Sequence, residues 1–554
     1  MKWIVKSLRA TDDLFKDLLK SRNIIDFDKF ITSSLSDFYD PFIIPMIQDA
    51  VSRIQKAIAS KELIYIYGDF DVDGTAATAI LWIYLKELGA NVLPYIPNRV
   101  DEGYGMNLKT LTQLKNNGAS LIISVDCGIR DIELVEQMKD QGVDIIITDH
   151  HEFVLKDNKP ILPNTIVIHS LHPLSPYKWV LSGGATAWKL VCAIEKTLTG
   201  NPLSEKSLSL LEYATLTTIT DIMPLMEENR VIVKMGIENL RKTQKIGLLK
   251  LIEVSGIEKN KIDEYHIGYI LGPRLNAPGR VDNSAMDSLR LLCTTNDSQA
   301  MKLAIKVNDL NKIRQEWTAK YLEMGVSQVD LKQKVIFILG EDWPEGIVGL
   351  VAGKLAEKFG RPCLVATYNT KEDKVTGSAR TYGDVNIVEM ISWCSHYLTK
   401  FGGHKAAAGF SLKVVNVDKF KNLLFEKSHE LISDELLEHK LKIDLEARPQ
   451  EINLHLIQDI ESLAPFGNSN LNPIFTLKNM KIIEYKKIGR NNEHLKIKIL
   501  DEFDKNTFDA LGFNYDKAPV LLGDLINIAF IPKKNIWNNV ESIQLEIKDI
   551  IKLT

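Results

Sequence analysis

The sequence has no long apolar run and no paired cysteines. The longest candidate run, from Val520 to Ile531, is shorter than the roughly 18 residues of a membrane span and contains Asp524. Charged residues interrupt the first ten positions, so we expect no signal peptide. The five cysteines lie far apart without a C-x-x-C pair, which argues against a disulfide framework or a thiolate zinc site. These absences predict a soluble, cytoplasmic protein with no membrane partner.

Strong compositional bias is also missing. Glycine (32) and proline (19) are near their usual frequencies, and the 45% of hydrophobic and 25% of charged residues are typical of globular proteins. A chain of 554 residues is too long for one core, so we expect two to four domains. The net charge of −4 neither supports nor excludes a nucleic-acid partner, because phosphate binding depends on local positive charge.

From residue 63 onward, short apolar runs alternate with helix-like segments. The pattern predicts strands at 63–67, 91–96, 121–125 and 143–147, and helices at 75–88, 108–115 and 131–140. Continuously apolar strands joined by helical crossovers are typical of a parallel sheet, so the predicted fold class is α/β. In such sheets ligands bind beyond the carboxyl ends of the strands, which is where we look for chemistry.

The second half of the chain predicts two further parts. A charged segment at 287–328 has helical periodicity, and its expected apolar stripe is Leu289, Leu292, Leu303, Ile305, Leu310 and Ile313. A second α/β unit begins near residue 334 and runs to about 430. The later β-prone runs at 481–485, 494–500 and 525–531, with turn signals at 489–492 and 533–535, predict a small β-barrel.

Acidic residues and imidazoles stand at the ends of the predicted strands. The members of this set are Asp69, Asp71 and Asp73, then Asp126, then Asp149, His150 and His151, and finally Asp221. A calcium loop starting at Asp69 would need a glutamate at its twelfth position, which is Ile80. Each group alone is equally compatible with a turn or a helix cap. Together, oxygen and imidazole ligands at one sheet edge predict a hydrolase with two Mn²⁺ or Mg²⁺ ions that grip a phosphate.

The motif Asp149-His150-His151, with residues 68–74 upstream, resembles the signature of the DHH phosphoesterase superfamily. Further motifs resemble the RecJ family, the bacterial single-stranded-DNA-specific exonucleases, and they lie at 97–99, 102–105, 272–280, 377–380, 401–409 and 465–467. The resemblance runs from about residue 40 to the end, and residues 1–40 receive no role.

The resemblance implies a domain order and an activity. The implied parts are a lead segment (1–50), a parallel-sheet DHH domain (51–283), a connecting helix (284–330), a smaller α/β DHHA1 domain (331–435) and an OB-like β-barrel (436–554). The implied activity is metal-dependent 5′-to-3′ degradation of single-stranded DNA to 5′-mononucleotides, in DNA repair and recombination. A single-strand-binding protein is the implied protein partner.

The resemblance also implies roles for individual residues. The implied metal ligands are Asp71, Asp73, Asp126, His150 and Asp221, with Asp69 and Asp149 as neighbouring supports. His151 is expected to contact or protonate the reacting phosphate, and Asp73 and Asp126 are expected to share in catalysis. The expected phosphate and DNA contacts are Arg99, Arg280, Ser378, Arg380, Gly402, Gly403 and His404. In the barrel, the expected contacts to the DNA backbone are Lys486, Lys487, Arg490, Lys496 and Lys498.

The sequence departs from the family pattern at three places. His169-Ser170 replaces an Asn-Pro pair, Pro344-Glu345 replaces a histidine after Trp343, and Asn468-Ser469-Asn470 follows Phe466-Gly467. None removes an expected metal ligand. Two alternatives stay open: a DHH-type phosphodiesterase for short oligonucleotides or cyclic dinucleotides, and an inactive DNA-binding scaffold. The scaffold reading would be favoured by missing acidic ligands, which are all present here.

Overall fold

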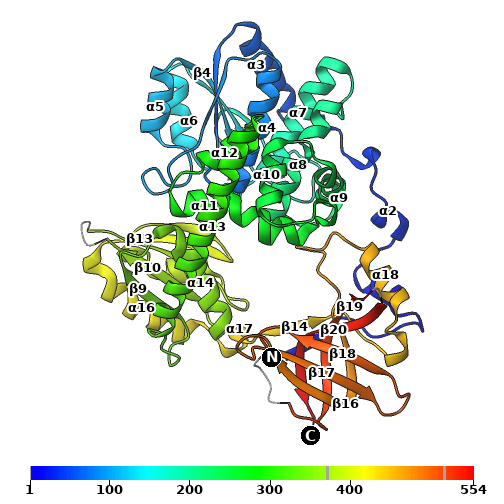
Figure 1. Cartoon of the computed structure of the whole chain (residues 1–554). Helices are drawn as coiled ribbons and strands as arrows, with labels where there is room; N and C mark the ends of the chain where they lie inside the picture. Colours follow the sequence, from blue (N-terminus) through cyan, green and yellow to red (C-terminus); the bar gives the residue numbers. More distant parts are fainter. Residues whose placement is uncertain (1, 370–372, 516–519, 539, 554) are drawn as a thin grey trace. The chain divides into compact units, whose positions relative to one another are not determined.

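The computed structural model describes residues 2–369, 373–515, 520–538 and 540–553 (Figure 1). Its backbone forms two compact units. The smaller consists of Met1–Ser33, Glu438–Phe466 and Leu471–Thr554, and the larger of Ser34–Leu437 and Gly467–Asn470. Among the described residues, no helix is both long enough and apolar enough to cross a membrane.

A five-stranded parallel sheet forms the first part of the larger unit, as the sequence predicts. Its strand order is β3-β2-β4-β5-β8. The bounds are β2 Leu63–Tyr67, β3 Val92–Tyr95, β4 Ala119–Val125, β5 Asp144–Thr148 and β8 Ile166–Ile168. Because all five strands run the same way, the carboxyl ends of β2, β4 and β5 meet at one edge.

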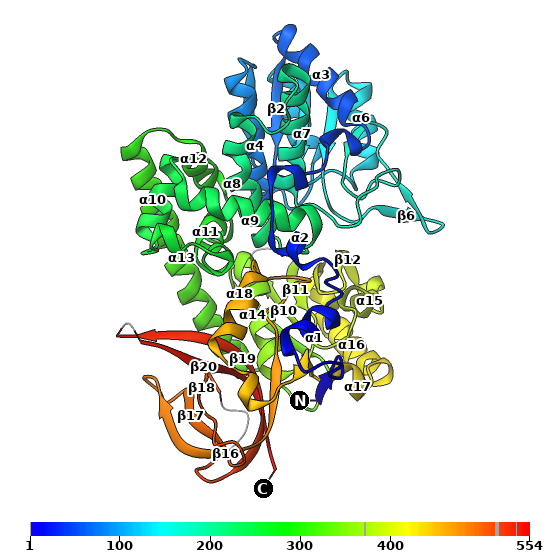
Figure 2. The same cartoon turned by 90° about the vertical axis from the view of Figure 1, so that its right-hand side faces the viewer.

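Helices cover both faces of this sheet (Figure 2). On one face lie α3 Ile47–Ala59, α4 Val72–Glu87, α7 Gly183–Thr199 and α8 Glu205–Thr220, and on the other α5 Leu108–Asn116 and α6 Ile132–Asp140. Each face of the sheet has its own hydrophobic core, and alternate residues of β2 point into the two cores. Ile64 and Ile66 pack with α4 on one face, whereas Tyr65 and Tyr67 pack with α5 and α6 on the other. A strand buried on both faces has to be apolar throughout, which explains its sequence.

More helices follow the sheet, and the connecting segment is two helices rather than one. The remaining bounds are α9 Glu227–Lys242, α10 Ile246–Val254, the π-helix η4 His266–Leu271, α11 Gly272–Val281, α12 Met286–Cys293 and α13 Asp297–Val326. The break occurs because the Asn296 side chain caps α13, accepting a hydrogen bond from the backbone N–H of Gln299 at 2.9 Å. Of the predicted stripe, Leu289, Leu292 and Leu310 are buried, whereas Ile305 is exposed. Ala300, Ala304 and Val307 complete the buried face of α13.

The second α/β part of the larger unit has a mixed five-stranded sheet in the order β12-β13-β11-β10-β9. Strands β9 Ile336–Glu341 and β10 Cys363–Tyr368 are parallel, and β11 Val375–Arg380, β12 Leu398–His404 and β13 Ala407–Leu412 are antiparallel to their neighbours. The helices are α14 Glu345–Phe359, α15 Ile387–Ser392, α16 Val417–Leu431 and α17 Asp434–Leu437. Helix α13 packs against α11 and α14, so it links the two parts.

The smaller unit contains the predicted barrel. Its strands are β15 Leu445–Glu446, β16 Phe475–Ile488, β17 His494–Asp501, β18 Thr507–Gly512, β19 Leu525–Trp537 and β20 Val540–Lys552, and the pairing of β16 with β19 closes the barrel. The turn predicted at 489–492 is confirmed. The turn predicted at 533–535 is wrong, because these residues continue β19 and pair with residues 542–544 of β20.

The N-terminal segment packs within the smaller unit. Strand β1 Lys2–Val5 pairs in parallel with β14 Lys440–Ile443, and Lys6 Nζ lies 2.9 Å from Asp444 Oδ1. Leu14 and Leu18 of α1 Leu14–Ser21 are buried in the barrel's core together with residues of α18 Leu454–Ser462. The first 33 residues therefore have a structural place that no pattern in the sequence indicates.

Candidate metal centre

The acidic and imidazole side chains converge where the strands of the first sheet end. Asp69 follows β2, Asp126 follows β4, and His150 follows β5. Asp126 has a φ of 62°, and this left-handed conformation turns the chain sharply at the sheet edge. The parallel order β2-β4-β5 brings the three segments side by side, as the sequence analysis expects.

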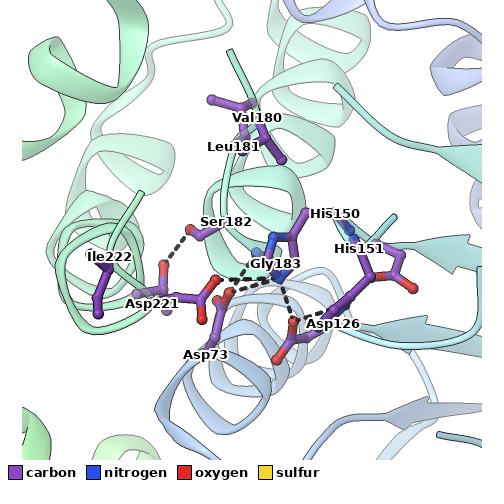
Figure 3. Close-up of polar contacts among 12 residues, drawn as sticks. Asp73, Asp126, His150, His151, Val180, Leu181, Ser182, Gly183, Asp221 and Ile222 are labelled. Carbon is purple, nitrogen blue, oxygen red and sulfur yellow. Dashed lines mark hydrogen bonds and ion pairs between the residues drawn. The ribbon is translucent and has the colours of Figure 1, made fainter. Parts of the chain in front are cut away.

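His150 lies at the middle of this cluster (Figure 3). Its Nε2 is 2.9 Å from Asp126 Oδ1, 3.6 Å from Asp73 Oδ2 and 3.5 Å from Asp221 Oδ2. Three overlapping groups place all their ligand atoms within 4.8 Å of one another, namely Asp126-Asp149-His150-His151, Asp73-His150-Asp221 and Asp69-Asp71-Asp126. The structure thus brings together every residue predicted as a metal ligand or support.

The backbone at the start of α7 holds Asp73. Its carboxylate accepts hydrogen bonds from the N–H groups of Gly183 at 2.7 Å and Gly184 at 2.6 Å. A Cβ atom at Gly183 would lie 2.7 Å from the Cβ of Asp126, so only glycine allows this approach. Gly183 and Gly184 are not among the predicted site residues, although a serine followed by two glycines before an apolar helix is a visible signal.

The buried carboxylates repel one another. Burial raises the pKa of Asp69, Asp126 and Asp221 well above the usual range, and neighbouring carboxylates raise it further. The same two causes raise the pKa of Asp73 to about 7. Asp69 Oδ1 is buried and has no hydrogen-bond partner among the described residues. An excess of buried negative charge with a free oxygen fits divalent cations, and oxygen and imidazole donors suit Mn²⁺ or Mg²⁺.

The two adjacent histidines differ in charge. Burial and the neighbouring His151 lower the pKa of His150 to about 3, so His150 is neutral and able to coordinate a cation. Burial opposes the charged form of His151 too, but the Asp149 carboxylate raises its pKa to about 9. His151 Nδ1 lies 2.8 Å from Asp149 Oδ1 and 2.9 Å from the Tyr104 hydroxyl. His151 is therefore held as a cation, with Nδ1 engaged.

A cavity of about 680 Å³ adjoins the His151 side of the cluster. The predicted residues that line it are Arg99, Asp149, His151, Ser378, Gly402, Gly403 and His404. Arg280 and Arg380 are not among its lining residues, although both belong to the same positive cluster. Burial lowers the pKa of Arg280 to about 9, with Arg99 and Arg380 as further causes. Arginines that lower one another's pKa form a ready site for an anion such as a phosphate.

Several residues that line the cavity are not among the predicted site residues. They are Phe70, Tyr104, Arg130, Glu152, Lys400 and Phe401. Tyr104 stands inside the motif Glu102-Gly103-Tyr104-Gly105, so its position carried a signal. Phe70 and Phe401 likewise stand in the motifs at 68–74 and 401–409. Arg130, Glu152 and Lys400 come from segments that meet only after folding, and no spacing in the sequence connects them.

The three departures from the family pattern lie around the cluster and the cavity. The ring of His169 accepts a hydrogen bond from the N–H of Leu171 at Nδ1 and donates from Nε2 to the carbonyl of His151 at 3.0 Å. Glu345 lines the cavity, and Asn468 donates from its side-chain amide to the carbonyl of Ile222, next to Asp221. His169 and Asn468 thus bond to main-chain carbonyls near the site, and none of the three departures changes the proposed ligand set.

The paired glycines of β12 give a testable contrast. A Cβ atom at Gly403, whose φ is 149°, would lie 2.3 Å from the carbonyl oxygen of Ala407, whereas one at Gly402 meets nothing within 4 Å. We expect Gly403→Ala to cost about 2 kcal/mol of folding stability. We expect Gly402→Ala to fold normally but to raise KM about tenfold, because its methyl group occupies the cavity. Thermal unfolding and steady-state kinetics on both variants check this, and equal stability of the two would contradict it.

Comparison with known proteins shows where this architecture occurs. Residues 63–215 match the DHH family, N-terminal domain, residues 331–430 match the DHHA1 domain, and residues 443–549 match the RecJ OB domain. The single-stranded-DNA-specific exonuclease RecJ of Bacillus subtilis is 36% identical over 94% of this chain. The chain therefore contains DHH, DHHA1 and RecJ OB domains. It spans 65% of the length of the B. subtilis relative.

Two solved RecJ structures share the fold of this chain. The crystal structure of RecJ in complex with Mn²⁺ from Thermus thermophilus matches all of this chain and 80% of its own, with a TM-score of 0.84 and 23% identity. A crystal structure of exonuclease RecJ bound to manganese covers 72% of this chain and 97% of its own, with a TM-score of 0.62 and 29% identity. The RecJ fold of DHH, DHHA1 and OB parts is therefore the fold of this chain.

Proposed function

We propose that this chain is a metal-dependent exonuclease, specific for single-stranded DNA, that degrades its substrate 5′ to 3′ and releases 5′-mononucleotides in DNA repair and recombination. The observation that carries the proposal is that a cation-binding cluster and a cavity suited to a phosphate adjoin each other within the larger unit. A cluster able to hold metal ions opens on its His151 side into a cavity of about 680 Å³ that adjoins clustered arginines. The RecJ relatives support this choice of substrate.

The proposed ligands of two ions are Asp71, Asp73, Asp126, His150 and Asp221, with Asp69 and Asp149 as supports. When bound, such ions polarise a phosphate and lower the pKa of water. The hydrogen bonds from Gly183 and Gly184 fix the orientation of Asp73, and burial excludes competing solvent. The protein thus supplies a preorganised arrangement of negative charge.

We assign proton donation to His151. Because Nδ1 is engaged by Asp149 and Tyr104, the ring has Nε2 left for the substrate. Release of a 5′-mononucleotide leaves its 3′ oxygen as the departing group, on the side of the terminal nucleotide. His151 lines the cavity that would take this nucleotide, so its cationic ring is placed to give a proton to that oxygen.

The proposed phosphate contacts are Arg99, Arg280, Ser378, Arg380, Gly402, Gly403 and His404. Arg380 Nη1 donates to Ser378 Oγ at 2.7 Å, and Arg280 Nη1 donates to the carbonyl of Gly346 at 3.1 Å. These bonds fix the two guanidinium groups without neutralising their charge. Fixed arginine donors bind a terminal or scissile phosphate and stabilise charge that develops on it.

The barrel is proposed to hold the strand through its basic face. Lys486 and Lys496 face each other across β16 and β17, and neither makes an ion pair within the described ranges. Lys498 is 3.5 Å from Glu484, and Lys487 donates to the carbonyl of Tyr515 at 2.9 Å. Of the five predicted basic residues, Lys498 is thus the one whose charge is paired with a carboxylate among the described residues, and the carbonyl contact of Lys487 leaves its charge in place.

This difference among the lysines predicts a selective loss of DNA affinity. We expect the double variant Lys486→Gln/Lys496→Gln to bind a single strand more weakly. The slope of log K against log salt should also be less steep by about 1.4, because each phosphate contact contributes about 0.7 to its magnitude. Lys498→Gln is the matched control, because Glu484 already neutralises that charge. Fluorescence anisotropy across a salt series measures both quantities, and an equal effect of Lys498→Gln would refute the assignment.

Digestion of a long single strand labelled at its 5′ or 3′ end tests the function. We expect early release of only the 5′ label, as a mononucleotide, in Mn²⁺ and none in EDTA. Rapid hydrolysis of dinucleotides without cleavage of the long strand would favour the small-substrate phosphodiesterase. Tight binding without cleavage would favour the scaffold. A cytoplasmic location and a single-strand-binding partner belong to the proposal through resemblance to the family alone.

A further inference from the structure

The acidic and imidazole cluster has a His151 side and an Asp221 side, and the cavity adjoins only the His151 side. The donor group with His151 and the donor group with Asp221 share His150, so the cluster extends from His151 to Asp221. The cavity is lined by His151 but not by Asp221. Figure 3 places Ile222 beyond Asp221, on the side away from His151. A strand whose terminal nucleotide fills the cavity therefore continues past Asp221.

The π-helix η4 packs beside this exit. Asp221 directly follows α8, and the last turn of α8 contacts η4 and the start of α11. A Cβ atom at Gly272 would lie 2.5 Å from Thr220 Cγ2, and one at Gly268 would lie 3.4 Å from Ile219 Cγ2. Because Gly268 and Gly272 have no side chains, η4 packs closely against the end of α8 that precedes Asp221. π-Helical turns are rare in proteins overall, and a large share of those that occur lie at functional sites.

Two tyrosines stand exposed on this segment. Tyr265 is 58% exposed and Tyr269 73% exposed, and their rings stack with centroids 5.1 Å apart and planes inclined by 26°. Ile222 is 69% exposed. Exposed large apolar side chains on segments that adjoin the metal cluster indicate a binding surface rather than a core.

Basic groups lie at the base of the same segment. Arg274 Nη1 donates to the carbonyl of Ile270, the residue after Tyr269. Burial and the charge of Arg274 lower the pKa of Arg314, which places the two guanidinium groups close together. Arg314 Nε is buried without a hydrogen-bond partner among the described residues. The charge of Arg314 also lowers the pKa of Arg280, so these cations join the positive cluster beside the cavity. Exposed aromatic faces together with a positive potential are a combination that binds single-stranded nucleic acid, with rings for bases and cations for phosphates.

We infer that Tyr265 and Tyr269 form a stacking platform for the bases of the single strand on the 3′ side of the scissile phosphate. The inference rests on the proposed function and adds to it a binding site for the uncleaved strand. Every base has a π-face, so the platform is tolerant of sequence. A dinucleotide barely reaches past the scissile phosphate, so the platform favours long substrates over short ones.

The test compares Tyr265→Ala/Tyr269→Ala with Tyr265→Phe/Tyr269→Phe, which retains the rings, and with Leu198→Ala as an unrelated exposed site on α7. For a 20-nucleotide strand, we expect KM of the alanine variant to rise about tenfold or more, since stacking on aromatic rings contributes about 1–3 kcal/mol per base. The ratio of kcat/KM for the 20-mer to that for a dinucleotide should fall by the same factor. The phenylalanine variant should keep the parental ratio.

Binding measured without cleavage separates this inference from the function on which it rests. A 20-mer with 2-aminopurine at its third to fifth positions, bound in EDTA, should lose fluorescence on the parent and lose much less on the alanine variant. This result supports the platform even if the parent degrades no DNA. Equal quenching by the two proteins, or an unchanged ratio of kcat/KM, overturns it. Equal loss on the dinucleotide and the 20-mer also overturns it, because a platform acts only on the longer strand.

Discussion

Replacing Asp126 by asparagine should abolish DNA hydrolysis and at the same time stabilise the metal-free protein. Asp126 is buried, its pKa is raised by burial and by Asp73 and Asp71, and its Oδ1 lies 2.9 Å from His150. Loss of this shared donor should lower kcat by about 10³-fold or more. Asparagine removes the charge, keeps the shape and tolerates the φ of 62° at this position.

The gain in stability has a defined dependence on pH. The folded-state pKa of Asp126 is above the unfolded value, so ionisation of the parent favours the unfolded chain once the pH exceeds about 4. The advantage of Asp126→Asn in metal-free buffer should therefore be small at pH 4 and should grow toward pH 8, to on the order of 1–3 kcal/mol. Adding Mn²⁺ should raise the Tm of the parent more than that of the variant.

Calorimetry at several pH values, with and without Mn²⁺, measures these effects. Asp140→Asn is the matched control, because Asp140 is exposed at the end of α6 in the same part of the chain. We expect this control to change neither activity nor the response to metal. A fully active Asp126→Asn enzyme would remove Asp126 from the ligand set. A variant less stable than the parent in EDTA at pH 8 would contradict the repulsion argument.

The sequence was sufficient to bring the proposed metal ligands together, because most of them follow apolar strands. Once β2, β4 and β5 are recognised as parallel neighbours, their carboxyl ends have to meet, so Asp73, Asp126 and His150 are predicted together. Asp221 was also singled out as an acid in an apolar context, although it follows a helix rather than one of these strands. The hydrogen bonds of Asp73 could not be derived, since they come from glycines 110 residues away along the chain.

Other parts of the fold depend on contacts that no local pattern reveals. The pairing of β1 with β14 joins residues more than 430 positions apart. The break between α12 and α13 depends on one asparagine cap within a segment of otherwise continuous periodicity. The lysines at 533–534 resemble a turn, yet cross-strand partners such as Glu541, 3.3 Å from Lys534, keep them in β19. In each case a tertiary contact outweighs the local preference.

Replacing Asp149 by asparagine should cause the largest loss of stability. The Asp149 carboxylate is fully buried and accepts hydrogen bonds from the backbone N–H groups of Ile129, His150 and His151 and from the ring of His151. Both oxygens are occupied, so the amide NH₂ of asparagine would face an N–H donor in either orientation. We expect a loss of about 3–5 kcal/mol, because a buried charged partner is removed and donors are left unsatisfied.

The same variant should change the protonation of His151 and the response to acid. Without the carboxylate, the pKa of His151 falls from about 9, and the proton proposed for the leaving oxygen is held less firmly. The folded-state pKa of Asp149 is depressed, so its contribution is present above the unfolded value near 4 and is lost as the pH falls through the folded value. The stability gap between parent and variant should therefore narrow below pH 4.

Asp144→Asn, at the other end of β5, is the control for this prediction. Asp144 is 60% exposed and its Oδ2 lies 2.6 Å from Arg53 Nε, so its loss should cost less than about 1 kcal/mol. Urea unfolding at pH 7 and pH 3.5 measures the gap, and NMR titration of the His151 ring measures its pKa. A constant gap across these pH values would show that Asp149 acts through packing rather than charge. An unchanged pKa of His151 would show that Asp149 does not hold His151 as a cation. The proton donor would then have to be another residue of the cavity.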